Sequence, residues 1–157
     1  MRLRRLAAGE QALARSVFGA ALDPKRTWIL TGAPTGPWAM VVFGLMLFPV
    51  DVADFSATGV HRQAWFVHEL THVWQFQTRP LWTLQSWARA ALTGGYGFGR
   101  AYRYALPLQW RKLNLEQQAK AVEHAFLRRH GARSPDMPPG AEIEDYIAAG
   151  IDLVSTV

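Results

Sequence analysis

Two histidines four residues apart, with a glutamate after the first, are the residues of this chain best suited to metal chemistry. They are His68, Glu69 and His72 in the stretch "FVHELTHVWQFQ", residues 66 to 77. On a helix, the two histidines are one turn apart, so both imidazoles point from the same face and can share one ion. Glu69 lies about 100° further round, where its carboxylate can reach a water on that ion. The spacing predicts a site for metal-assisted hydrolysis.

The other face of this predicted helix is apolar. Phe66, Leu70 and Val73 follow helical spacing there, so the helix has a core side and a site side. The chain has no cysteine. A disulfide, a thiolate zinc ligand and a cysteine nucleophile are therefore excluded, and any metal must bind to His, Asp or Glu.

The five residues from His68 to His72 have the form His-Glu-x-x-His, which resembles the signature of the zincin metallopeptidases. With "GEQALARSVFG", "LDPKRTWI" and a predicted strand pair, "HELTHVWQ" is more closely similar to the Vgr-related metallopeptidase domains associated with bacterial contractile injection and type VI secretion systems. The resemblance extends from about residue 6 to residue 130. It implies a zincin-like fold, a Zn²⁺ cofactor, a peptide or protein substrate, and association with secretion-apparatus spike proteins.

The resemblance also implies a third protein ligand. The metzincin form "HExxHxxGxxH" is excluded because this chain reads "HELTHVWQFQT". In the gluzincin form a later helix supplies a glutamate, and "NLEQQAKAVE" offers Glu116 and Glu123, seven residues apart and so nearly on one face. The "E-x-x-A" form at Glu116 matches the family pattern better. We therefore expect Glu116 as the third ligand, with Glu123 as the alternative.

One position departs from the family pattern. Many gluzincins have an aspartate four residues after the ligand glutamate, which supports a ligand histidine, whereas this chain has Lys120. Glu123, Asp51 or Asp54 would have to replace that aspartate, or no residue does. The departure predicts weaker metal affinity or slower turnover.

Within the resemblance, Glu69 takes a proton from the attacking water and returns it to the leaving amine. The oxyanion needs a further donor. The candidate donors are Tyr96, Tyr102, Tyr104 and His124. Tyr102 and Tyr104 rank first because they come just before the helix of the third ligand, although core packing is the alternative for each. His61 and His130 are interpreted as surface or structural residues.

The elements that must position this site follow from periodicity and turn residues. Helical spacing predicts helices at 9–19, 60–77, 81–92, 114–131 and 141–154. Asn114 and Gln117 form a predicted capping box, and a Pro/Gly-rich linker at 131–140 precedes the last helix. Two β-rich runs, 26–31 and 38–48, predict adjacent strands of a small sheet. Residues 93–99, "TGGYGFG", predict a flexible connector that could cover the site.

Length and composition limit the number of domains, the possible partners and the compartment of the protein. The 157 residues predict one α+β domain, 1–157, in which a small sheet lies over the His68–His72 helix. The net charge of +5 comes with no recognisable RNA or DNA motif, so no specific nucleic acid is expected. The longest apolar stretch, 38–49, is too short for a membrane span, and the basic N-terminus does not develop into an export signal. The default expectation is the cytoplasm, unless a secretion apparatus exports the protein.

Three functions remain open from the sequence. The first is zinc-dependent hydrolysis of peptide bonds, and Glu69 favours it because a structural zinc site needs no general base. The second is a non-catalytic zinc-binding interaction domain of a secretion apparatus, which the missing aspartate favours. The third and weakest is a basic surface that binds nucleic acid or anionic lipid.

Overall fold

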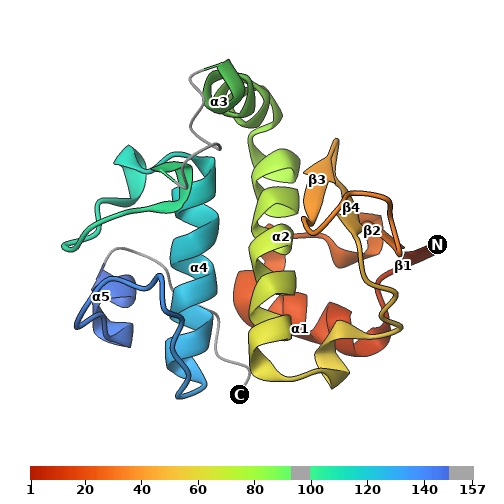
Figure 1. The fold of residues 1–157 in the computed structure, drawn as a ribbon, viewed down its shortest axis with the longest axis horizontal. Helices are drawn as coiled ribbons and strands as arrows, with labels where there is room; N and C mark the ends of the chain where they lie inside the picture. The colour runs from red at the N-terminus through yellow and green to blue at the C-terminus, as the bar shows by residue number, and fades with distance from the viewer. Residues whose placement is uncertain (93–99, 149–157) are drawn as a thin grey trace.

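A four-stranded sheet packs against long helices in the computed structural model of the chain, which describes residues 1–92 and 100–148 (Figure 1). The strands are β1 (Arg2–Arg5), β2 (Trp28–Thr31), β3 (Met40–Val42) and β4 (Leu45–Phe48). The α-helices are α1 (Ala8–Phe18), α2 (Val60–Thr78), α3 (Pro80–Leu92), α4 (Leu115–Arg129) and α5 (Ile143–Ala148). The arrangement is α+β, as the sequence predicts.

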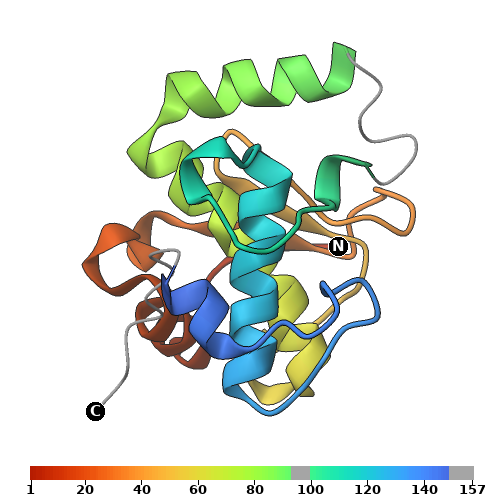
Figure 2. The same cartoon turned by 90° about the vertical axis from the view of Figure 1, so that its left-hand side faces the viewer.

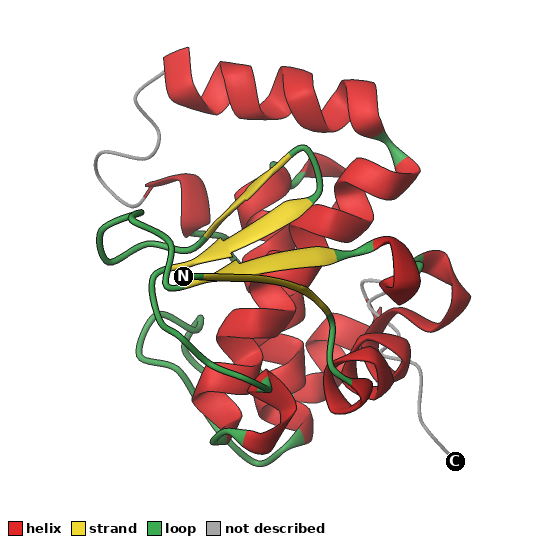
Figure 3. Ribbon diagram, turned by 90° about the vertical axis from the view of Figure 1, so that its right-hand side faces the viewer, coloured by secondary structure: helices red, strands yellow, loops and turns green. Residues whose placement is uncertain are grey.

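The sheet has the order β1-β2-β4-β3. β2 and β4 run parallel, while β1 pairs with β2 and β3 with β4 in antiparallel register. Because side chains alternate between the two faces of a strand, Ile29, Met46 and Phe48 are buried on one face, whereas Trp28 and Met40 are exposed on the other. Figure 3 shows the sheet in front, with helices behind it.

The sequence interpretation of the strands needs two corrections. The run 38–49 is not one buried strand: it forms the β3–β4 hairpin, and Phe43 and Gly44 turn the chain with φ angles of 50° and 81°. A basic N-terminal segment also forms the additional strand β1, because the Arg4 side chain points inward to the buried carboxylate of Glu10. An arginine-rich segment gave no apolar alternation from which a strand could be predicted.

Helix α2 is buried on two sides. Phe66, Leu70 and Val73 pack into the sheet-side core, which confirms the predicted apolar face. On the other side, Ala64 and Val67 join a second core with α4, the helix that α2 contacts most extensively. Figure 1 shows the two helices side by side, with the sheet beyond α2. The face of α2 that carries the histidines is therefore turned toward α4.

Helix α4 begins and ends as its sequence predicts. The Asn114 side chain accepts from the backbone N–H of Gln117, and the Gln117 side chain accepts from the backbone N–H of Asn114. At the other end, Gly131 has a positive φ of 69°, which suits a glycine after a helix. This cap fixes where the first turn of α4 lies, and Glu116 belongs to that turn.

The remaining helices lie around this centre. α3 crosses above the ends of α2 and α4, as Figure 2 shows. α5 covers part of the predicted helix 141–154: residues 141 and 142 precede it without helical structure, and residues 149–154 lie outside the described residues. The predicted connector 93–99 lies outside them as well. No helix in the described part of the chain is long and apolar enough to cross a membrane.

Candidate metal centre

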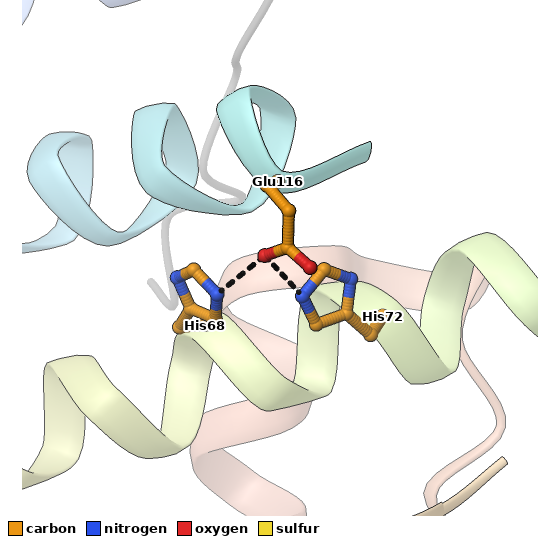
Figure 4. A group of neighbouring side chains, drawn as sticks. All are labelled: His68, His72 and Glu116. Atoms are coloured by element: carbon orange, nitrogen blue, oxygen red, sulfur yellow. Dashed lines mark hydrogen bonds and ion pairs between the residues drawn. The ribbon is translucent and has the colours of Figure 1, made fainter. Parts of the chain in front are cut away.

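Two histidines of α2 and one glutamate of α4 converge in the interior (Figure 4). The ligand atoms of His68, His72 and Glu116 all lie within 4.8 Å of one another. All three side chains are buried, with exposed fractions of 6%, 8% and 7%. One oxygen of Glu116, Oε2, is 3.4 Å from His68 Nε2 and 3.2 Å from His72 Nε2. This group could bind a metal ion.

The spacing of these atoms fits a small divalent ion. Ligands about 2.0–2.1 Å from zinc are about 3.3–3.4 Å apart at the tetrahedral angle, and the two measured separations lie close to that range. Two imidazoles and a carboxylate are a donor set that catalytic zinc sites use. The residues present therefore fit a metal ion such as zinc in their chemistry and in these two separations.

Each histidine is oriented by a partner at its other nitrogen. Nδ1 of His72 is 2.9 Å from Oε1 of Gln75, and Nδ1 of His68 is 2.9 Å from Oε2 of Glu123. Both partners are acceptors, so the network assigns the proton to Nδ1 in the neutral rings. The Nε2 lone pairs are then directed at Glu116, where an ion would need them.

Charge in the metal-free site is shared between the rings and the carboxylates. Burial lowers the pKa of His68, but hydrogen bonds to Glu116 and Glu123 outweigh it and raise the pKa to about 10. Burial also lowers the pKa of His72, but the charge and the hydrogen bond of Glu116 together outweigh burial, so the pKa is raised. The two histidines hold the pKa of Glu116 below its usual range against the opposing effect of burial. These shifts favour the charged form of each of the three groups.

Glu69 is a buried acidic residue beside the three candidate ligands, and one of its carboxylate oxygens has no hydrogen-bond partner among the described residues. It is 4% exposed, and the oxygen without a partner is Oε2. Burial raises its pKa above the ordinary value, although His68 and His72 act in the opposite direction. A carboxylate in such surroundings binds a proton more readily than one in water. Glu69 can therefore serve as a proton acceptor beside the three candidate ligands.

The two tyrosines predicted as oxyanion donors lie in different surroundings. The ring of Tyr102, in the short 3₁₀ turn Arg100–Tyr102, lies 6.4 Å from the ring of His68. Burial, with the charges of Glu116 and Glu69, raises the pKa of Tyr102 to about 12, so its hydroxyl keeps its proton. Tyr104 instead bonds through its hydroxyl to His124 and Tyr146. Tyr102 thus lies near the candidate site, whereas the hydroxyl of Tyr104 contacts residues outside the group of candidate ligands.

The other residues considered from the sequence are also placed. Asp51 accepts from the Thr31 hydroxyl, and Asp54 caps a 3₁₀ turn through the backbone N–H of Ser56. His61 and His130 are exposed, which agrees with their interpretation as surface residues. Of the three carboxylates proposed to support a ligand histidine, Glu123 is the one that contacts His68.

Sequence reasoning missed Gln75, which lies three residues after His72 on α2. Its Oε1 contacts His72, and its amide nitrogen donates to the Leu115 carbonyl and to Gln118 of α4. The i to i+3 spacing in "HVWQ" was a usable signal, since side chains three apart on a helix are neighbours. The contacts with α4 could not be predicted without the tertiary structure.

Comparisons with known proteins give two similarities, while no family model matches the chain. The type VI secretion system spike protein VgrG2b of Pseudomonas aeruginosa is 33% identical over 135 residues. That alignment covers 81% of this chain but 13% of the spike protein. The solved effector domain of Pseudomonas aeruginosa VgrG2b matches with a TM-score of 0.66 and 26% identity, over 97% of this chain and 84% of that one. This homology to the VgrG2b effector domain links the chain to Vgr-related proteins of type VI secretion.

Proposed function

We propose that this chain is a zinc-dependent peptidase, with His68, His72 and Glu116 as metal ligands and Glu69 as general base. One observation carries the proposal. A buried carboxylate oxygen of Glu69 lacks a partner among the described residues, next to three candidate ligand atoms that all lie within 4.8 Å of one another. A purely structural metal site has no use for such a group, and leaving it unpaired is costly.

The chemistry of these side chains supports hydrolysis. Zinc, when bound, would acidify a water and polarise a substrate carbonyl. Glu69 accepts the proton of the attacking water, and its raised pKa suits it to pass that proton to the leaving amine. Tyr102 keeps its own proton and can donate a hydrogen bond to the oxyanion that develops on the substrate.

A role in type VI secretion supplies the biological setting. VgrG2b of Pseudomonas aeruginosa is a spike protein of that system, and this chain matches 13% of its length. We infer that this chain acts as an exported effector that associates with secretion-apparatus spike proteins. Co-purification of the chain with a spike protein of its own secretion system checks this inference.

Glu69→Gln tests the enzyme directly. The substitution keeps size and polarity but removes the proton acceptor, so zinc content and fold should be retained. Hydrolysis should fall by about 10²–10⁴-fold, the usual contribution of a general base. We would incubate a denatured protein mixture with each variant and measure new peptide termini by mass spectrometry, alongside the zinc content of each variant.

Two controls make the result decisive. Glu144→Gln removes an exposed carboxylate on α5 and should cleave as the wild type does. A chelated wild-type sample should be inactive. Equal cleavage in wild type, Glu69→Gln and chelated samples would point to a contaminating protease. A zinc-loaded wild type that cleaves none of many varied peptides would contradict the peptidase and favour the interaction domain.

A further inference from the structure

Glu123 and Glu116 contact opposite edges of the His68 ring. Glu116 Oε2 lies 3.4 Å from Nε2, whereas Glu123 Oε2 lies 2.9 Å from Nδ1. An imidazole that binds a metal through Nε2 carries its proton on Nδ1, and an acceptor there fixes the ring and increases its basicity. Glu123 is in the position of that acceptor. The two glutamates are seven residues apart, so α4 brings both to His68 from one face.

Glu123 is itself held by cationic and acidic neighbours. The ammonium group of Lys120 lies 3.1 Å from Oε1 and 3.0 Å from Oε2 of Glu123. The same ammonium group lies 2.9 Å from Asp136, in the segment that links α4 to α5. Asp136 is in turn bonded to Ser134 and His124. This chain of contacts restricts the orientation of the Glu123 carboxylate.

We propose that Glu123 is the positioning residue of His68, and that Lys120, clamped by Asp136, fixes Glu123 in that role. Lys120 occupies the position at which the sequence resemblance predicts a supporting aspartate, and Glu123 lies three residues further along α4. The inference rests on the proposed zinc site. It adds that the chain supplies its own orienting carboxylate, and that metal affinity is not weakened by the lysine.

Zinc affinity of the apo chain is the direct measurement, by competition with a chromophoric chelator. Glu123→Ala leaves His68 Nδ1 without its acceptor, and zinc affinity should fall by about 10–100-fold. Lys120→Met leaves the His68 contact but frees Glu123, and its affinity should lie between those of wild type and Glu123→Ala. The matched control Glu144→Ala removes an exposed carboxylate and should bind zinc as tightly as wild type.

Glu123→Gln keeps the shape and an acceptor oxygen, so it reports on charge even if Glu123→Ala does not fold. Its affinity should fall less than that of Glu123→Ala but clearly below wild type. The Co²⁺ absorption bands of both variants should shift from the wild-type spectrum, because the ligand field at His68 changes. A change in global stability alone would not shift these bands.

The outcomes separate this inference from the proposed function. If wild type binds no zinc, the proposed site is wrong, and the inference fails with it. If wild type binds zinc and Glu123→Gln binds equally tightly with an unchanged Co²⁺ spectrum, Glu123 does not position His68, although the peptidase proposal stands. If Glu144→Ala also lost zinc affinity, the fall in the Glu123 variants would result from the lost negative charge alone. That outcome also overturns the inference.

Discussion

At the residue scale, a proton on His68 would compete with a metal ion for the ring. His68 has a pKa of about 10 in the metal-free chain, so at pH 7 it is protonated and must lose that proton to bind zinc. Zinc binding at pH 7 should therefore release at least one proton, and affinity should rise as the pH rises from 6 toward 10. Titration calorimetry in two buffers of different ionisation enthalpy measures the release. A binding enthalpy equal in both buffers would contradict it.

The site residues differ in how far the sequence could predict them. His68, Glu69 and His72 share a predictable geometry, because four residues on a helix make one turn. Glu116 could be selected only through the resemblance, since the sequence alone left Glu123 equally well placed on the same face. What separates the two is which edge of the His68 ring each reaches, and that depends on how α4 lies against α2.

At the scale of elements, Gln75 joins the two helices of the site. Its side chain is fully buried and bonds to His72 of its own helix and to Leu115 and Gln118 of α4. Such an amide fixes the rotation of α2 relative to α4, because each contact has a required direction. The candidate ligands on the two helices are thereby held facing one another.

Gln75→Leu tests this role of the amide. Leucine has a comparable size but removes the hydrogen bonds of Gln75 to the Leu115 carbonyl, to Gln118 and to His72 Nδ1, at about 1–3 kcal/mol for each buried polar group left unsatisfied. We expect the free energy of unfolding of the apo chain to fall by about 2–4 kcal/mol, measured by urea denaturation. Gln85→Leu on the exposed face of α3 is the control and should change it by less than about 0.5 kcal/mol. If both substitutions lowered the free energy of unfolding equally, Gln75 would not act as a bridge between α2 and α4.

The elements themselves were predicted unevenly. α2 and α4 have long apolar periodicity and α4 has a capping box, and both were located closely from sequence. The β3–β4 hairpin was missed because its turn contains Phe43, a residue that rarely adopts a positive φ. β1 was missed because its structure depends on Arg4, whose ion pair with Glu10 forms only in the folded chain.

At the scale of the whole molecule, α2 belongs to both cores. Its residues Phe66 and Leu70 pack with the sheet, while Ala64 and Val67 pack with α4. The carboxylate of Glu10 adds a further connection, because it accepts from Arg4 of β1 and from the backbone N–H of Phe55, which precedes α2. An element shared in this way couples the stability of its neighbours, so we expect the chain to unfold as the single domain that its length predicts.

Zinc should therefore stabilise parts of the molecule that it does not contact. A ligand at 100 times its dissociation constant adds about 2.7 kcal/mol to a two-state protein. Amides that exchange through global unfolding should then exchange about a hundredfold more slowly, in β2 and β4 as well as in α2 and α4. Hydrogen exchange followed by mass spectrometry, with and without zinc, measures this by segment, and His68→Ala provides the control in which zinc should change nothing. Slower exchange confined to α2 and α4 would mean that the sheet opens independently, and the chain would then consist of two cooperative units joined by α2.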